Sequence, residues 1–213
     1  TDYFNLKLEN EKLTKENARL RLQLFNQVND STTPHLNVDY EIVTAKVTKN
    51  SFASPRNYLT INIGENSGIE QDMGVMTTNG ILGVIENTSN NFATVQSILN
   101  TKSSINAKIK NSDYFGSLIW DAKNYNVVQL IDIPRSVPLM IGDTIVTGAM
   151  SSIFPENIPI GTIKKYELNQ SQSSYNIDIN LFNDMANIRT VYIIKNKNRK
   201  EILELEKATT DAQ

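Results

Sequence analysis

Residues that could support catalysis are few and scattered in this 213-residue chain. A Ser-His-Asp site needs an imidazole beside the serine and a carboxylate that orients it. The single histidine, His35, comes directly after a turn-rich linker at 29–34, where a solvated side chain is expected. Gly142 and Asp143 are similar to the run before the nucleophile of serine proteases, but Thr144 follows them. A Ser/Lys pair stays open, although no spacing singles one out. We therefore expect no enzyme and keep a serine hydrolase as an alternative.

Metal and cofactor sites have no matching residue pattern either. The chain contains no cysteine, which excludes disulfides, thiol catalysis and Cys-based zinc sites. One histidine and dispersed carboxylates provide no cluster of ligands. The Gly-Glu-Asn-Ser-Gly stretch at 64–68 lacks the lysine of a phosphate-binding loop and does not open a helix. The sequence predicts neither a metal nor a cofactor.

The charge balance and hydropathy exclude two further classes of site. The formal net charge of −2 provides no strong positive field, so we expect no nucleic-acid partner. No apolar run approaches the roughly 20 residues that cross a bilayer, and no signal peptide is present. The chain begins with Thr1 and enters helical sequence directly, which indicates a piece of a longer protein.

Residues 1–28 have the heptad pattern of a coiled coil. Leucine recurs every seventh residue at position d, and two of the position-a residues are asparagines, which lower stability but favour two in-register strands. In a parallel pair, Glu16 would face Arg21 of the other helix. We predict a dimer, with a single amphipathic helix lying on the globular part as the alternative. The predicted seam consists of Tyr3, Leu6, Asn10, Leu13, Asn17, Leu20 and Leu24.

The sequence from Tyr40 to about Lys195 is typical of β-structure. Short runs of β-branched and apolar residues alternate with Gly, Asn, Asp, Ser and Pro. Many short strands at close spacing favour barrels or sandwiches. A short helix stays open within 89–104. A frayed tail is expected at 196–213, with one or two helical turns at Ile202, Leu203 and Leu205 as the alternative. The expected strands are 42–47, 58–63, 81–86, 127–132, 158–164, 176–181 and 190–194.

A weak internal repeat favours two related small barrels. Residues 58–85 and 128–163 share the order strand, tight turn, strand and glycine-containing strand. The predicted turn-forming residues are Gly64, Gly68, Gly74, Gly80, Gly83, Gly142, Asp143, Pro155 and Gly161. The predicted fold is mainly β, with two small β-barrel domains preceded by an N-terminal coiled-coil α-helix. Its parts are a helix and linker (1–34), a first barrel (35–110), a second barrel (111–195) and a polar tail (196–213), with strand exchange between the barrels left open.

The order of these motifs resembles the MreC family of rod shape-determining proteins. A coiled coil directly before the β-region is also that family's layout. Gly148-Ala149 follows Thr147 where the family usually has Ser-Gly, and Asn157 takes the place of a glycine. Asparagine tolerates left-handed backbone best after glycine, so the loop is expected to keep its shape. The matching segments are 56–64, 68–69, 73–75 and 80–83, then 142–147, 153–155 and 158–161.

This resemblance implies a non-enzymatic scaffold of the bacterial cell envelope. MreC-like proteins are anchored in the cytoplasmic membrane by one upstream helix, with their β-domains on the periplasmic or extracytoplasmic face. They dimerise through the coiled coil and can form filaments. They bind a class B penicillin-binding protein and so promote peptidoglycan synthesis together with RodA, while MreD and MreB belong to the same elongation complex. A periplasmic adaptor of an efflux or secretion system is the alternative, although those adaptors usually have a returning helix that is missing here.

Exposed aromatic side chains are the expected anchors for such a partner, because they dominate interface energetics. Binding one conformation of the partner more tightly than another would shift its equilibrium. The candidates are Tyr58, Tyr114, Phe115 and Trp120.

Overall fold

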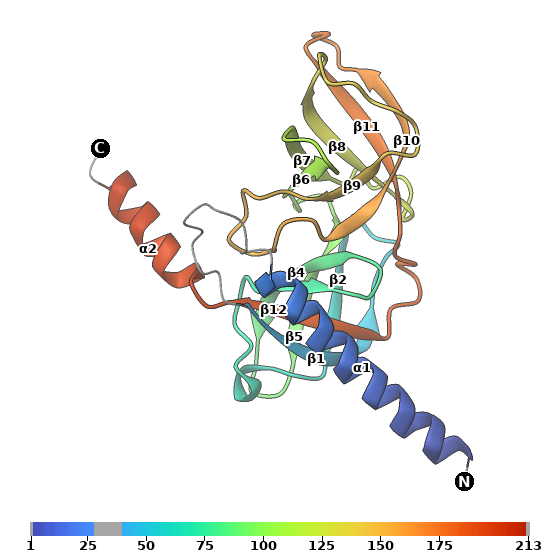
Figure 1. Cartoon of the computed structure of the whole chain (residues 1–213), viewed down its shortest axis with the longest axis vertical. Helices are drawn as coiled ribbons and strands as arrows, with labels where there is room; N and C mark the ends of the chain where they lie inside the picture. The colour runs from blue at the N-terminus through green and yellow to red at the C-terminus, as the bar shows by residue number, and fades with distance from the viewer. Residues whose placement is uncertain (1, 28–39, 212–213) are drawn as a thin grey trace.

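A computed structural model describes residues 2–27 and 40–211 of the chain. It contains an N-terminal helix, α1 (Asp2–Gln27), and two closed six-stranded barrels. Figure 1 shows how these parts are arranged. The predicted mainly β fold with two barrels after a helix is confirmed. The linker at 29–34, His35 and the side chain of Tyr3 lie outside what the structure describes. Within the described ranges, neither helix is long and apolar enough to cross a membrane.

Barrel 1 is closed by a strand from the end of the chain. Its strand order is β1-β12-β3-β4-β5-β2, and each neighbouring pair is antiparallel. A short 3-10 turn, η1 (Glu65–Ser67), lies between β2 and β3. The strands are β1 (Tyr40–Asn50), β2 (Arg56–Ile61), β3 (Gly74–Met76), β4 (Ile81–Thr88), β5 (Ala93–Asn100) and β12 (Thr190–Asn196).

Barrel 2 is built from strands that are consecutive in the chain. Its order is β10-β11-β8-β7-β6-β9, again antiparallel throughout. The short strand β9 closes the barrel between β6 and β10. The strands are β6 (Ile105–Ile109), β7 (Phe115–Ile119), β8 (Val127–Pro134), β9 (Thr144–Thr147), β10 (Pro159–Leu168) and β11 (Ser174–Leu181).

The barrel boundaries differ from those predicted. β6 lies within the predicted first domain but belongs to barrel 2, and β12 lies within the predicted second domain but belongs to barrel 1. Barrel 2 is thus inserted between β5 and β12. The physical reason is edge closure, because without β12 both β1 and β3 would present unpaired backbone groups. Residues 191–194 of β12 are buried on both faces, so this strand fits only a fully covered position.

Two other segments also differ from expectation. The segment considered for a short helix, 89–104, contains strand β5, whose Ala93 and Val95 are buried. The tail contains a 12-residue helix, α2 (Arg199–Thr210), with no buried residue. Glu201 in its first turn and Lys207 in its last turn complement the helix dipole. Arg199 pairs with Asp72 of barrel 1 at 3.4 Å, which ties the start of this helix to the body.

Candidate interaction surfaces

Helix α1 packs against barrel 1 through one face of its C-terminal half. Ala18, Leu22 and Phe25 are partly buried on the core. The rings of Phe25 and Tyr40 meet edge to face, with their centroids 6.1 Å apart. If Leu6 occupies heptad position d, these three helix residues fall at positions b and f. The barrel therefore contacts a face of the helix outside the predicted seam.

Arg21 fastens the same helix to the β3–β4 turn and to β12. Its Nη2 donates to the backbone oxygen of Thr78 at 2.6 Å, and its guanidinium lies 5.9 Å from the centre of the Tyr192 ring. Burial lowers the pKa of Arg21 and raises that of Tyr192, while their proximity partly opposes both shifts. Arginine stays protonated in spite of such a shift. Arg21 is thus occupied within its own chain.

Glu16 also has a partner within its own chain. It accepts two hydrogen bonds from Arg19, at 3.0 and 2.6 Å, and these lower the pKa of its carboxyl group. Both members of the interhelical pair that the heptad pattern suggests, Glu16 and Arg21, thus have contacts within their own chain, and the pair between helices stays a prediction.

The predicted seam lies outside the face of α1 that packs on barrel 1, although Leu6, Asn10, Leu13 and Asn17 line the open clefts beside the helix. At 3.6 residues per turn, positions a and d are centred about 120° from the barrel-facing positions. The helix can therefore contact its barrel and a second helix at once, and dimerisation stays a prediction. The described seam residues are all exposed, with the leucines between 45 and 67 % exposed: Leu6, Asn10, Leu13, Asn17, Leu20 and Leu24.

The loop between β9 and β10 connects the two barrels. Its Phe154 is almost completely buried and lies on Gly74 of barrel 1, where an added Cβ would stand 2.7 Å from the ring. The backbone oxygen of Ser152 accepts a hydrogen bond from the Asn196 side chain at 2.9 Å. A loop that belongs to barrel 2 in sequence thus packs into barrel 1.

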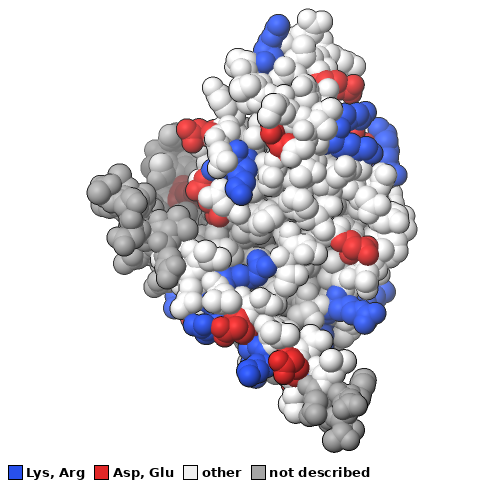
Figure 2. Space-filling view, turned by 45° about the vertical axis from the view of Figure 1, so that its right-hand side comes forward, with Lys and Arg blue, Asp and Glu red and all other residues white. Residues whose placement is uncertain are grey.

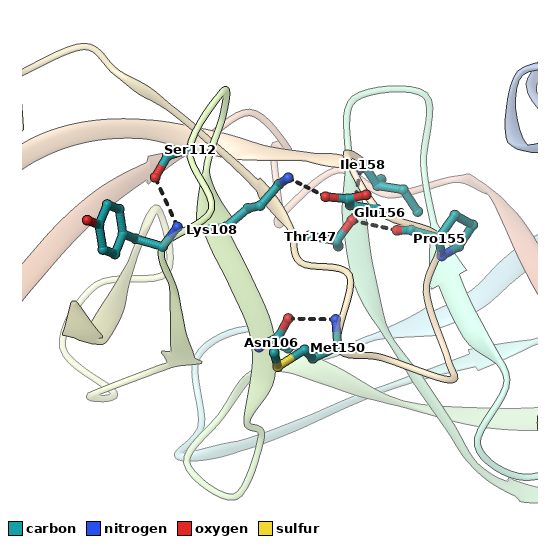
Figure 3. A network of polar contacts seen from close by, with 9 residues as sticks. Asn106, Lys108, Ser112, Thr147, Met150, Pro155, Glu156 and Ile158 are labelled. Atoms are coloured by element: carbon teal, nitrogen blue, oxygen red, sulfur yellow. Dashed lines mark hydrogen bonds and ion pairs between the residues drawn. The ribbon is translucent and has the colours of Figure 1, made fainter. Parts of the chain in front are cut away.

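A polar network holds this loop in shape (Figure 3). The Thr147 hydroxyl donates to the backbone oxygen of Pro155 at 2.7 Å and accepts from the Ile158 N–H at 2.9 Å. Lys108 of β6 pairs with Glu156. Asn157 has a φ of 70°, so asparagine adopts the left-handed backbone expected at the place of the family's glycine.

A second junction depends on Asn183, which the sequence did not single out. Its Nδ2 donates to the backbone oxygens of Ile81 and Gly80 at 2.8 and 3.3 Å, and its Oδ1 accepts from the Thr77 hydroxyl. It follows β11 and thereby fixes the return of the chain to barrel 1. One asparagine among many in the sequence carries no signal of such a role. Asn50 adds a bond to the backbone oxygen of Met185 at 2.8 Å.

The predicted turn-forming residues lie where backbone is crowded or tightly turned. Gly142 has a φ of 93°, and the carboxylate of the adjacent Asp143 accepts from the Met140 N–H at 2.9 Å. Gly68 is left-handed at the end of η1. At four other glycines an added Cβ would lie 2.0 to 2.3 Å from a neighbouring backbone oxygen: Gly64, Gly80, Gly83 and Gly161.

The four candidate aromatic anchors are separated by the fold. Trp120 is only 5 % exposed and its Nε1 donates to the Asn124 oxygen at 3.0 Å, so its selection as an exposed anchor was wrong. It shares the inner face of its chain segment with Leu118, two residues earlier. Tyr58 is half-buried in barrel 1. Tyr114 and Phe115 lie together at the β6–β7 turn and are 47 and 42 % exposed.

The surface is of mixed charge, and two open clefts lie beside α1. Lys and Arg are interspersed with Asp and Glu across the face seen in Figure 2, with broad uncharged areas between them. Two open clefts of about 830 and 520 Å³ flank α1, and neither is lined by a serine or by a histidine of the described chain. Residues 2–27 and 40–211 contain no group of three His, Asp or Glu side chains placed to hold a metal.

Comparison with known proteins identifies relatives of this chain. Residues 47–195 match the family model described as rod shape-determining protein MreC, barrel core. The cell shape-determining protein MreC of Listeria monocytogenes is 27% identical over 186 residues, which cover 86% of this chain and 61% of that protein. The chain thus spans about three fifths of that relative's length.

Solved structures show the same fold. MreC of Listeria monocytogenes superposes with a TM-score of 0.70 at 26% identity, covering 92% of this chain and 91% of that one. The major periplasmic domain of a protein described as the cell shape-determining filament MreC gives 0.66 at 20% identity, covering 78% and 100%. MreC of Helicobacter pylori, solved in complex with the penicillin-binding protein PBP2, gives 0.58 at 16% identity, covering 74% and 100%.

Proposed function

The chain belongs to the MreC family of rod shape-determining proteins, and from that premise we propose that it is a dimerising scaffold that binds a class B penicillin-binding protein. The observation that carries this proposal is the double junction between the barrels, through Phe154 and Asn183. This double junction favours a rigid arrangement of the two barrels, with separate surfaces available for contacts. The family is named for cell shape rather than for a reaction.

Dimerisation is supported by the two different faces of α1. One face holds barrel 1 through Arg21 and Phe25, while the leucines of the seam are exposed to solvent. Covering apolar surface contributes roughly 25 cal/mol per Å². A parallel pair of helices would cover these leucines and hold two barrel bodies side by side.

The partner contact is supported by a relative and by the exposed aromatics. The Helicobacter pylori protein of this fold forms a complex with PBP2. In the present chain, Tyr114 and Phe115 are consecutive exposed aromatic residues where β7 of barrel 2 begins. We propose that they anchor the penicillin-binding protein in the conformation active in peptidoglycan synthesis. Binding that conformation more tightly than the inactive one would shift its population toward activity.

The location and the wider complex follow from the same premise. The parent protein would be anchored in the cytoplasmic membrane by a helix upstream of this chain, with the barrels on the extracytoplasmic face. The description of a related structure as a periplasmic domain supports this placement. RodA, MreD and MreB would be further members of the complex.

The partner contact can be tested with the substitution Phe115→Asp. A charge at a buried anchor opposes desolvation, and loss of an interface hot spot costs 2 kcal/mol or more, roughly a 30-fold weaker Kd. Binding of the full chain to the purified extracytoplasmic part of the class B penicillin-binding protein from the same bacterium would be measured by biolayer interferometry, with the Tm recorded for each variant.

Phe92→Asp is the matched control, because Phe92 is a similarly exposed aromatic on barrel 1, at 49 %. It should bind like the unaltered chain. Unchanged binding by Phe115→Asp would remove the β6–β7 turn from the interface. No binding by the unaltered chain would refute the proposed partner.

A further inference from the structure

The far end of β10 is an open strand edge. β10 pairs with β9 only between Pro159 and Thr162, whereas its pairing with β11 continues to Leu168. At Ile163 the loop before β9 covers the edge, since Gly142 donates to the Ile163 oxygen and Ile163 donates to the Asp143 oxygen, both at 2.9 Å. The outer edge of 164–168 faces no further strand of the described chain, and all five residues are exposed. Figure 1 shows this hairpin projecting at the top of barrel 2.

The outward backbone groups of this edge belong to Tyr166 and Leu168. The Asn169 N–H donates to the Ser174 oxygen at 2.8 Å, which fixes Asn169 as a residue bonded to β11. Residues of an antiparallel strand alternate between bonding to one side and to the other. Glu167 therefore also bonds toward β11, and its two neighbours direct their N–H and C=O groups outward. Such an edge is a template for another strand.

We propose that this edge pairs antiparallel with the same edge of a second copy of the chain, about a twofold axis at Tyr166. In this register, Lys165 lies opposite Glu167 of the second copy, and Glu167 lies opposite Lys165 of the second copy. Opposite charges at facing positions stabilise a pair of strands. The contact is isologous, as a twofold axis requires.

The alternative registers have no such complementarity. A twofold axis at Glu167 would pair Tyr166 with Leu168 of the second copy, but it would place two glutamates opposite each other, which is unfavourable. A twofold axis at Leu168, the other outward residue, would place Lys165 opposite Ser171 and Glu167 opposite Asn169. Both charges would then face neutral side chains. Lys165 already lies 3.5 Å from Asp178 of β11, and the exposed remainder of its side chain would meet Glu167 of the second copy. Charge matching thus selects the axis at Tyr166 and selects a second copy as the occupant.

The surroundings of the edge are prepared for such a contact. The Tyr166 ring stacks edge to face on Tyr175 with centroids 5.5 Å apart, and its hydroxyl donates to the Leu139 oxygen at 3.1 Å. This side chain is therefore ordered before association. Beside the start of the edge, Met140 and Ile141 are 70 and 72 % exposed, an apolar pair that a neighbouring strand would cover. This contact would be a second interface between copies of the chain, in addition to the proposed coiled coil. It rests on the proposed function only because that function requires copies of the chain to associate.

A single introduced thiol tests the register, because the natural chain has no cysteine. Facing residues of a hydrogen-bonded antiparallel pair have Cα atoms about 5.5 Å apart, within the range of a disulfide. Tyr166→Cys in the full chain should therefore give a covalent dimer under mild oxidation. In the matched control Leu168→Cys, the two thiols would lie about 13 Å apart along the strands. We expect dimer formation on non-reducing gels to be at least tenfold faster for Tyr166→Cys. Equal rates would overturn the proposal.

Charge reversal tests the pairing of Lys165 with Glu167. In the Tyr166→Cys background, Lys165→Glu alone places two glutamates opposite each other, and Glu167→Lys alone places two lysines opposite each other. Each should slow the cross-link about tenfold. A mixture of the two variants restores lysine opposite glutamate and should recover the original rate as a mixed dimer. Damage to the fold of either variant would not be repaired by mixing, so the absence of recovery refutes the contact.

These outcomes separate the edge from the coiled coil. Helix α1 is unaltered in every variant, so a failure of the coil to dimerise affects them alike and leaves the ratio of Tyr166→Cys to Leu168→Cys above one. A failed edge contact makes the two rates equal even where the coil dimerises.

Discussion

At the residue scale, the packing of Phe154 on Gly74 explains why a glycine stands in β3. The substitution Gly74→Ala would place a methyl group 2.7 Å from the ring, and overpacking of this kind costs about 1–3 kcal/mol. Phe154→Leu makes room but leaves a partly empty site. The double variant should therefore lose less free energy of unfolding than the sum of the two single variants. Urea denaturation of the three variants measures this coupling.

Gly68→Ala provides the control for this comparison. Gly68 is left-handed, and an added Cβ would meet no atom within 4 Å, so its cost comes from backbone strain alone. Combined with Phe154→Leu, it should be additive. Additive costs for Gly74→Ala and Phe154→Leu would contradict the proposed contact between the barrels.

Three single residues show how much of the contact surfaces could be predicted from the sequence. Asn157 was predictable, because few residue types tolerate a left-handed backbone and the family pattern marked the position. Trp120 was not, since strand composition alone does not say which face meets the core. The alternation of Leu118 and Trp120 is visible only once the inner face is known. Asn183 has partners 102 to 106 positions away in the chain, and local sequence contains no trace of them.

At the scale of elements, the exposed seam of α1 predicts dimerisation, which can be tested by substitution of a seam leucine. Leu13→Asp would place two charges in the dimer seam, where burial of an unpaired charge is strongly unfavourable. We expect the dissociation constant of the dimer to rise more than tenfold in sedimentation equilibrium. Leu8→Asp alters a leucine of comparable exposure, 63 % against 55 %, at heptad position f outside the seam. It should leave the dimer unchanged, and an equal effect of both variants would argue against the heptad assignment.

The positions of strands in the sequence were more predictable than the partners with which they pair. Runs of β-branched residues identified most of the barrel strands, because that signal is local. The placement of β6 and β12 depended on which open edges remained to be closed, and that is decided by contacts distant in sequence. The short strands β3 and β9 contain three and four residues, too few for an alternating pattern to emerge. Helix α2 is longer than the one or two turns that the sequence left open, because its polar composition resembles a frayed tail.

At the scale of the whole molecule, the insertion of barrel 2 into barrel 1 couples the two. Phe154, from the β9–β10 loop, and Asn183, which follows β11, both contact barrel 1. The rings of Phe52 and Tyr125 also meet between the barrels, with their centroids 5.3 Å apart. In the sequence, the whole of barrel 2 lies between the first five strands of barrel 1 and β12, which closes it. Folding of barrel 1 is therefore tied to segments distant in sequence, which slows folding in general.

This topology predicts that the two barrels differ in autonomy. A fragment of residues 103–182 contains all six strands of barrel 2 and should melt cooperatively by circular dichroism. A fragment of residues 40–101 lacks β12, which leaves one edge of β1 and one edge of β3 unpaired and removes the buried Val191 and Ile193, so it should show no cooperative melt. Adding a peptide of residues 187–198 in excess should restore folding by mass action. The same peptide with Ile193→Asp should not, because its charge would enter the barrel core. A cooperative melt of 40–101 without the peptide would mean that β12 is dispensable for closing barrel 1.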